Sequence, residues 1–246
     1  MRSKTLLTVA IAICSLASCK KNGASNPSGN SNKLKMYIED ARATPFNSID
    51  TFYLTYDNDD RLTSLASAKL KFTYAYNANT SFTLDLFESG LLSIHEIAYI
   101  KGGTTIDSTF QFNNTHDSTT EKYFYNGSLL ASKITYTYHR LGSQVDSREV
   151  YTYDNNGNLT KTVQFGGAGN ITTYTYTDKP LQFTTNPSYY PVQSKNLPAT
   201  QKQTDGAGNP IATVTYSYEF DSAGRVIKET DSLGNGIFVV KLYTYY

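Results

Sequence analysis

The chain has 246 residues, and its 22 Lys and Arg against 21 Asp and Glu give a formal net charge of +1. That balance excludes a strongly basic nucleic-acid-binding protein, and a hydrophobic fraction of 39% excludes a disordered chain. The two cysteines are too few for a disulfide scaffold. The length allows one large domain or two small ones.

Residues 1–18 are predicted to be an export signal. Arg2 and Lys4 precede an apolar stretch, Leu6 to Leu16, that is too short to span a bilayer. The stretch ends in Leu16-Ala17-Ser18-Cys19, which resembles the lipobox of bacterial lipoproteins. That resemblance implies cleavage before Cys19 and lipidation of this cysteine. The alternative is a plain secretory signal cleaved after Ser18.

Residues 19–32 are predicted to be a flexible tether. The run from Lys20 to Asn32 consists of Lys, Asn, Gly, Ala, Ser and Pro, and cannot bury apolar area. We therefore expect a lipid on Cys19 to hold a folded domain at a membrane of the cell envelope. Lys20 stands where an inner-membrane retention signal has Asp, which favours the outer membrane and leaves its periplasmic and surface sides open.

Residues 33–246 are predicted to form a single β domain built on a repeated hairpin pattern. The clearest copy is Tyr151-Thr152-Tyr153-Asp154-Asn155-Asn156-Gly157, and Tyr216 to Gly224 is a second. In such a turn the Asp carboxylate accepts backbone N–H bonds and the Gly takes a positive φ. The turn-forming residues of these copies are Asp154, Gly157, Asp221 and Gly224. Asp60 stands where a third copy would have Gly.

The residues between the turns alternate, which is typical of strands. Tyrosines spaced by two flank Thr or Ser at Tyr136/Tyr138, Tyr174/Tyr176 and Tyr243/Tyr245. Only residues 65–70 and 86–100 would also suit short helices. We predict an all-β fold, a long curved antiparallel meander of these hairpins or an open or partly rolled barrel.

The pattern Y-x-Y-D-x-x-G-[RN]-[LV] resembles the YD/RHS repeat. With Ser194-Lys195-Asn196-Leu197-Pro198 before Tyr216, it is similar to Bacteroidota lipoproteins that carry a YD-repeat-like β domain of unknown function. The resemblance is good over residues 151–246 and looser over 50–150. It implies a β-shell architecture and provides no catalytic residue. The chain is shorter than the long proteins of that family, so we do not expect it to enclose a cargo.

Residues 178–204 interrupt the hairpin pattern with Pro180, Pro187, Pro191 and Pro198, which cannot lie in central strands. We predict a long loop packed over one face or end of the sheet. Its candidate binding residues are Tyr189, Tyr190, Lys195 and Asn196. The alternative is an ordered cover that protects a sheet edge.

The remaining motifs give little support for catalysis or metal binding. His116-Asp117-Ser118 has triad residue types without a nucleophile elbow, and His95-Glu96 lacks the second histidine of a zinc motif. The Asp- and Asn-rich segments 57–60 and 154–158 suggest calcium loops, but turn chemistry already explains them. We expect no catalytic residue, no cofactor and no metal.

These features predict a lipid-anchored envelope protein with a non-catalytic role in binding a glycan, a peptide or an envelope partner. One alternative is a structural or accessory subunit of an outer-membrane uptake or secretion assembly, and a second is an extracytoplasmic hydrolase. The membrane is the partner expected through the N-terminal lipid, and no nucleic acid is expected. Asp107-Ser108-Thr109 and Asp117-Ser118-Thr119 also resemble O-glycosylation acceptors.

Overall fold

The computed structural model describes residues 33–113, 117–138, 144–166, 169–182, 189–191 and 194–246, with only the backbone described at 144–146. Over these residues the chain forms sixteen β-strands. No helix in this part of the chain has the length and apolar character needed to cross a membrane. The strands are β1 Leu34–Asp40, β2 Ile49–Tyr56, β3 Leu62–Ala66, β4 Leu70–Asn77, β5 Ser81–Glu88, β6 Leu91–Lys101, β7 Thr105–Asn113, β8 Ser118–Asn126, β9 Leu129–Tyr138, β10 Gln144–Tyr153, β11 Leu159–Phe165, β12 Ile171–Pro180, β13 Asn196–Thr204, β14 Pro210–Phe220, β15 Val226–Gly234 and β16 Ile237–Tyr245.

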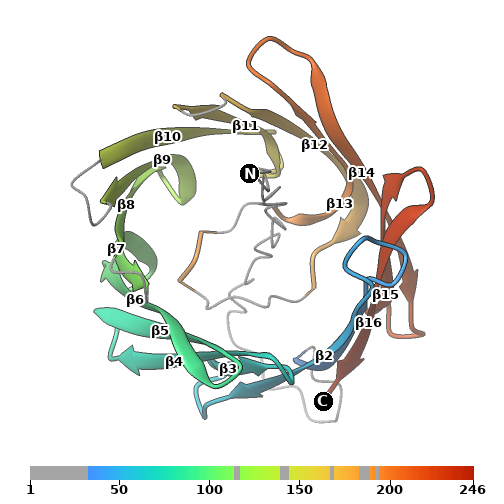
Figure 1. The fold of residues 1–246 in the computed structure, drawn as a ribbon, viewed down its shortest axis with the longest axis horizontal. Coiled ribbons are helices and arrows are strands. Elements are labelled where there is room, and N and C mark those ends of the chain that lie inside the picture. The colour runs from blue at the N-terminus through green and yellow to red at the C-terminus, as the bar shows by residue number, and fades with distance from the viewer. Residues whose placement is uncertain (1–32, 114–116, 139–143, 167–168, 183–188, 192–193) are drawn as a thin grey trace, which may run out of the picture.

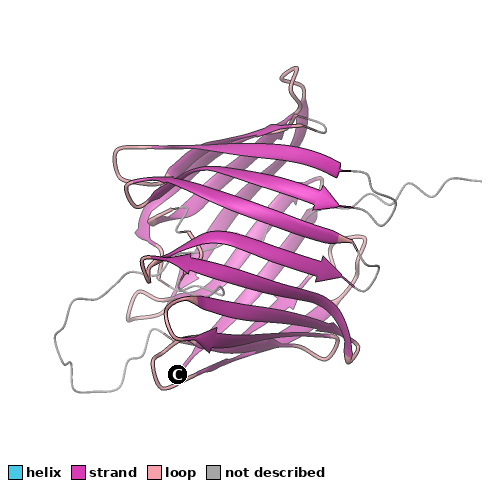
Figure 2. Ribbon diagram, turned by 90° about the vertical axis from the view of Figure 1, so that its left-hand side faces the viewer, coloured by secondary structure: helices cyan, strands magenta, loops and turns pink. Residues whose placement is uncertain are grey.

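The strands pair in chain order and close into a barrel. Each strand is antiparallel to the next, and β16 returns to pair with β1. At this closing pair Tyr37 lies opposite Tyr243 and Glu39 opposite Lys241. Figure 1 looks down the barrel, and Figure 2 shows its wall of tilted strands from the side.

Closure goes beyond the expected meander or open barrel. Because β1 and β16 satisfy each other's backbone groups, no sheet edge remains to be protected along the described strands. The two segments that would also suit helices are not helical. Leu65 lies in β3 and Leu70 begins β4, while residues 86–100 fall in β5 and β6. Cross-strand pairing therefore overrides their local apolar pattern.

The repeated turns have the expected chemistry at atomic level. The Asp154 carboxylate accepts the backbone N–H groups of Asn156 and Asn158, and Asp221 does the same for Ala223 and Arg225. Gly157 and Gly224 have φ of +83° and +77°, while Asp60 has +64° at the equivalent place. A left-handed residue after the Asp thus reverses the chain between strands.

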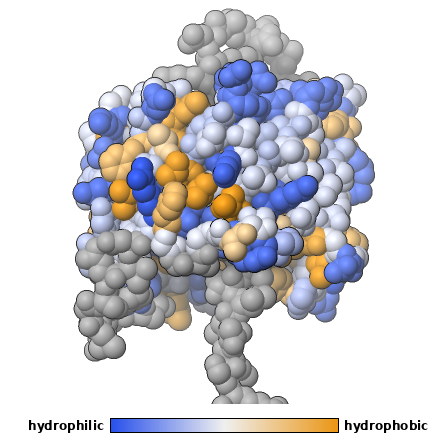
Figure 3. Space-filling view, turned by 90° about the horizontal axis from the view of Figure 1, so that it is seen from above, coloured by the Kyte–Doolittle hydropathy of each residue, from blue (hydrophilic) through white to orange (hydrophobic). Residues whose placement is uncertain are grey.

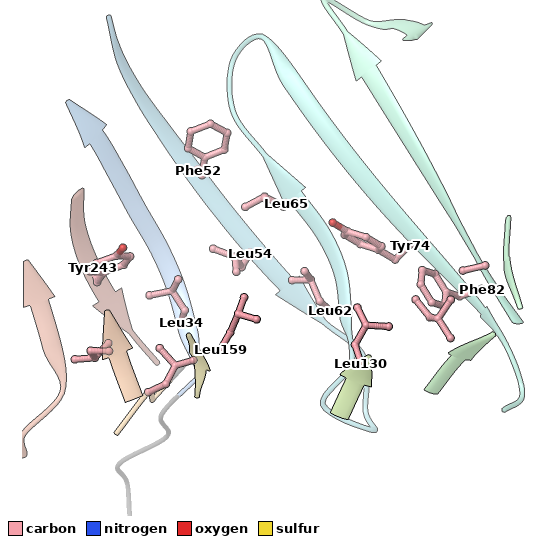
Figure 4. Packing of buried hydrophobic residues seen from close by; sticks show 14 of the residues in the cluster. Leu34, Phe52, Leu54, Leu62, Leu65, Tyr74, Phe82, Leu130, Leu159 and Tyr243 are labelled. Carbon is pink, nitrogen blue, oxygen red and sulfur yellow. The ribbon is translucent and has the colours of Figure 1, made fainter. Parts of the chain in front are cut away.

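The core lies inside the barrel. The buried hydrophobic residues come from β1–β11, β13, β15 and β16 and form one cluster, which strands arranged in a ring can share only in their interior. Figure 4 shows members of this cluster projecting from one face of their strands. The alternate residues of each strand face outward.

An apolar ring runs around one end of this interior. Every odd-numbered strand places a fully buried apolar residue at its first or second position. The ring consists of Leu34, Leu62, Phe82, Ile106, Leu130, Leu159, Leu197 and Val226, each no more than 4% exposed. The hairpin repeat therefore has a packing role beyond its turn.

Tyrosine hydroxyls form hydrogen bonds to the backbone at this apolar ring. A tyrosine in the second half of an even-numbered strand donates to a carbonyl near the start of the preceding odd-numbered strand. The pairs are Tyr56–Leu34, Tyr76–Leu62, Tyr125–Ile106, Tyr176–Leu159, Tyr218–Pro198 and Tyr245–Val226, at 2.6–2.9 Å. Tyr153 occupies the same place in β10, but no described residue hydrogen-bonds to its buried hydroxyl.

The expected loop of residues 178–204 is shorter in the structure, because both of its ends belong to strands. β12 continues to Pro180 and β13 begins at Asn196, so the connection spans residues 181–195. Pro180 and Pro198 lie in strands because both pair where the β12–β13 register is irregular, and such positions tolerate a missing N–H. The described part of the connection turns into the barrel, where Tyr189 and Tyr190 pack on Phe82 at the inner face of the sheet.

Candidate functional site

The lumen carries two groups of charged side chains. They occupy the same inward-facing positions as the buried tyrosines, in the pattern charged–x–Tyr at Glu121/Tyr123, Glu149/Tyr151 and Lys241/Tyr243. The alternation of strand side chains therefore brings each charge and its tyrosine to one face. We treat these groups, with the β12–β13 connection between them, as the candidate site.

The first group lies where β14, β15, β16 and β1 meet. The ammonium of Lys241 is 2.8 Å from Glu229 Oε1 and 2.8 Å from Asp231 Oδ2. Tyr243 donates its hydroxyl to Glu229 at 3.0 Å. Glu39 lies opposite Lys241 on β1. One lysine therefore serves several carboxylates in this group.

The pKa values of Glu229 and Asp231 in the first group are shifted in opposite directions. Burial, reinforced by the charge of Glu229, raises the pKa of Asp231 to about 7. Burial acts on Glu229 in the same direction, but Lys241 outweighs it and the pKa of Glu229 lies below its ordinary value. The pKa of Lys241 is raised, because its carboxylate neighbours outweigh burial. Near neutral pH, Lys241 and Glu229 are charged and Asp231 is close to half-protonated.

The second group lies across the lumen on β6, β8, β9 and β10. Lys133 donates to Glu121 at 2.7 Å and lies 3.9 Å from Glu149. Tyr123 donates to Glu121 at 2.6 Å, and Tyr151 donates to Glu149. Although burial pushes it upward, Lys133 and these hydrogen bonds hold the pKa of Glu121 below its ordinary value. A single lysine again faces more than one carboxylate.

The β12–β13 connection reaches the second group from the other side of the barrel. The ring of Tyr189 stacks on Phe82 at 6.1 Å between centroids, and Tyr190 meets Phe82 edge-on at 5.7 Å. Tyr190 donates its hydroxyl to Glu96, and Tyr189 donates to Asn79. Burial raises the pKa of Glu96, and the Tyr190 hydroxyl only partly offsets that. We call Tyr189–Pro191 the lumen plug.

The end of the β12–β13 connection is held by hydrogen bonds to the hairpin turn at residues 154–158. Asn158 Oδ1 accepts the backbone N–H groups of Lys195 at 2.8 Å and Asn196 at 2.9 Å. Ser194 donates to the hydroxyl of Tyr176 at 2.6 Å. The Lys195 side chain lies so close to Gly157 that a Cβ there would be 3.2 Å from it. The turn of Asp154 therefore also holds the residues at the start of β13.

The structure distributes the sequence-predicted site residues in three ways. Tyr189 and Tyr190 contact the far wall of the lumen, while Lys195 and Asn196 contact the turn at residues 154–158. Cys19 and His116 lie outside the described residues. His95 contacts Asp85 on the outer wall, away from the lumen groups.

Sequence reasoning missed the lumen charges themselves. The signal that could have found them is a charged residue two positions before the first tyrosine of a Y-x-Y pair, as at Glu149. Within the described residues, no three His, Cys, Asp or Glu side chains are arranged to hold a metal ion. The charged groups therefore offer hydrogen bonding and electrostatic attraction.

Comparison with known proteins shows the fold. No protein-family model matches the sequence, and no curated protein sequence matches it. A porin-like protein from Bacteroides vulgatus ATCC 8482 superposes with a TM-score of 0.64 and 12% identity, covering 87% of this chain and 98% of its own. A porin-like protein from Bacteroides uniformis ATCC 8492 gives 0.60 and 14%, covering 88% and 99%. The fold is similar to that of these porin-like barrels.

Proposed function

We propose that the chain is a non-catalytic interaction protein of the bacterial cell envelope, held at the outer membrane by a lipid on Cys19. In this proposal the barrel stands in water beside the membrane, without crossing it. The observation that carries the proposal is the orientation of the side chains. The interior holds most of the buried apolar residues and tyrosines together with the two ion-paired groups, while hydroxyl-bearing and charged residues recur among the exposed apolar residues of the outer wall.

The outer wall supports a barrel in water. Lys122 and Arg148 are exposed at the middle of β8 and β10, and the Asp85–His95 pair lies at the middle of β5 and β6. A lysine or arginine facing lipid at the midplane of a membrane barrel costs about 2–4 kcal/mol. Figure 3 shows one side of the wall, where hydrophilic side chains lie among and around the apolar ones.

Polar side chains also recur on the outward face of β12 and β13. β12 and β13 place Thr173, Thr175, Thr200 and Lys202 outward, and the hydroxyls of Thr175 and Thr200 contact each other at 2.7 Å. Threonine ladders of this kind suit a hydrated sheet surface. They do not provide the continuous apolar band of a membrane barrel.

The side chains in the interior favour a role in binding over a role as a channel. The lumen plug and the two ion-paired groups lie in the interior, where a channel would have its passage. The envelope location is supported by the export signal, by Cys19 and by the bacterial porin-like proteins with a similar fold. In this proposal a glycan, peptide or envelope partner binds at the outer wall or at the rims of the barrel.

A cleavable tether tests this function. A site for a specific protease placed within residues 20–32 should release the folded barrel from outer membranes into detergent-free buffer after cleavage. Metabolic labelling with palmitate should mark the wild-type chain and leave the Cys19→Ser variant unmarked. A cleaved barrel that stays in the membrane fraction would refute a barrel in water, and a chain that carries no lipid would refute the anchor.

Exposed aromatic residues on the wall favour the accessory-subunit role as a second candidate. Phe110, Phe112 and Phe124 lie outward on neighbouring strands β7 and β8, and each is more than a third exposed. Such a patch suits contact with another protein. Crosslinking in intact cells should then give one discrete partner, and substitution of Phe110 and Phe112 by Ser should remove it.

A further inference from the structure

The two ends of the β domain meet at one place on the wall. β1 and β16 pair along their length, and the backbone N–H of Tyr246 donates to the carbonyl of Lys33 at 3.1 Å. The residues that precede Lys33 therefore join the domain beside its last strand. In Figure 1 this closing pair lies opposite the wall formed by β7 and β8.

The outer surface around this closing pair is apolar. We call the outward side chains of β15, β16, β1 and β2 the seam face. Its large apolar members Ile49, Tyr53, Ile227, Phe238 and Leu242 are between 38% and 56% exposed. Cross-strand pairing makes the face continuous, because Leu242 lies between Ile38 and Lys228, and Met36 lies beside Tyr53.

The charges on the seam face are balanced or basic. The carboxylate of Asp40 pairs with Arg42 at 2.6 Å, and Lys228 pairs with Glu219 at 2.6 Å. The ammonium of Lys35 lies over the ring of Tyr246 at 5.7 Å from its centroid. Aromatic rings beside lysines are typical of side chains at the boundary between phospholipid headgroups and water.

The preceding segment limits which side of the barrel can reach a membrane. At about 3.3–3.6 Å per residue, residues 19–32 can extend at most about 50 Å. Lys20 and Lys21 follow Cys19 and carry the charge that anionic headgroups attract. An anchor on Cys19 therefore holds the seam face closer to the bilayer than the opposite wall.

We propose that the seam face rests on the phospholipid bilayer, with its aromatic and aliphatic side chains inserted among the headgroups. The inference rests on the lipid anchor of the proposed function and adds an orientation to it. Apolar surfaces that bind this way enter the headgroup region by about 5–10 Å, and the anchor adds to their affinity. The barrel then lies on its side and presents β7 and β8 to the surroundings.

Tryptophan substitution can report this orientation because the chain contains no tryptophan. We would prepare the anchored full chain as single variants Tyr53→Trp, Leu242→Trp and Phe124→Trp. Phe124 is 46% exposed on the opposite wall and serves as the matched control. Each variant would be reconstituted on vesicles of phosphatidylethanolamine and phosphatidylglycerol, with or without brominated acyl chains.

Bromine should quench the emission of the Tyr53→Trp and Leu242→Trp variants about two-fold, with a blue shift, because the introduced rings lie in the headgroup region. The emission of the Phe124→Trp variant should stay unchanged. Equal quenching at all three positions, or quenching at position 124 alone, would overturn the proposal. A blue shift at positions 53 and 242 that needs no vesicles and grows with protein concentration would also overturn it, and would assign the seam face to a second copy of the chain.

The mass of the peptide that contains Cys19 separates this proposal from the proposed function. An acylated chain without quenching at positions 53 and 242 refutes the seam face and leaves the anchor intact. If Cys19 carries no lipid, the anchor is refuted and the same variants are mixed with preformed vesicles. Quenching at positions 53 and 242 in that mixture still supports the seam face, and its absence overturns it.

Discussion

Individual tyrosines divide into two roles that their spacing does not reveal. In a Y-x-Y pair the first hydroxyl usually meets a charged or polar side chain, as Tyr151 does with Glu149. The second usually reaches a backbone carbonyl of the apolar ring, as Tyr176 does with Leu159. Both rings face inward, so alternation alone predicts only their shared face.

The second role predicts a contrast between two Tyr→Phe substitutions. Tyr76→Phe removes the 2.7 Å bond to the Leu62 carbonyl and should lower the free energy of unfolding by about 1 kcal/mol. Tyr153→Phe removes a buried hydroxyl that has no partner among the described residues, and should leave stability unchanged or slightly raised. Urea unfolding of both variants measures the contrast, and equal losses would contradict it.

The raised pKa of Asp231 predicts how the free energy of unfolding changes with pH. Its pKa is about 7 in the folded chain against an ordinary value of 3.8. Between these pH values the folded state binds more protons than the unfolded state, so this group makes stability fall as pH rises from about 4 to about 7. At 1.36 kcal/mol per pKa unit, the loss is at most about 4 kcal/mol.

Asp231→Asn should remove that loss. Relative to wild type, the variant should gain stability between pH 5 and pH 8, measured by urea unfolding at both values. Lys241→Met serves as a contrast, because it leaves Glu229 and Asp231 without their shared cation and should destabilise at the higher pH. An Asp231→Asn curve parallel to that of wild type would show that the carboxyl titrates normally.

Among the elements, the β12–β13 connection departs most from the hairpin pattern. Its prolines predict a loop, but they do not say which side of the sheet the loop takes. The described residues enter the lumen because Tyr189 and Tyr190 bury their rings against Phe82 while their hydroxyls reach Asn79 and Glu96. The lumen plug therefore supplies a hydrogen bond to Glu96, a carboxylate that β6 places in the lumen.

This arrangement predicts unequal effects of two neighbouring substitutions. Tyr190→Phe leaves the buried Glu96 carboxylate without that hydroxyl and should lower the free energy of unfolding by about 1–3 kcal/mol. Tyr189→Phe removes an exposed bond to Asn79 and should cost clearly less. Guanidinium unfolding compares the two variants, and an equal or larger loss for Tyr189→Phe would argue against burial of the Glu96 network.

Across the whole molecule, closure joins residues that are far apart in the sequence. The β1–β16 pair brings Lys33 beside Tyr246, whereas the other pairs join strands that are neighbours in the chain. A short linker between these two residues should therefore preserve the barrel. New ends at Asn235, in the exposed turn between β15 and β16, should be tolerated as well.

The circular permutant that combines both changes should keep the far-UV spectrum and a single cooperative unfolding transition. A permutant with the same linker but opened at Lys122, in the middle of β8, is the control and should fail to fold because it divides a central strand. If both permutants folded equally well, the closed ring would not be the unit that determines stability.

The sequence by itself determined the local structure of this protein. Alternating tyrosines and threonines are sufficient for strands, and Asp followed by Gly at the turn is sufficient for a reversal, because both depend on neighbouring residues. The same locality explains why residues 65–70 and 86–100 are ambiguous in sequence. Their strand state depends on partners such as Phe72 opposite Leu65 and Ile94 opposite Leu86.

Only the tertiary structure decided the closure, the lumen groups and the course of the plug. Closure depends on whether β16 reaches β1, which is set by the twist and stagger added up over all the strands. No short segment of the sequence determines that total. The lumen groups depend on it in turn, since Glu39 meets Lys241 only across the closing pair. Tyr190 and Glu96 likewise meet only because the ring brings opposite walls within the reach of one loop.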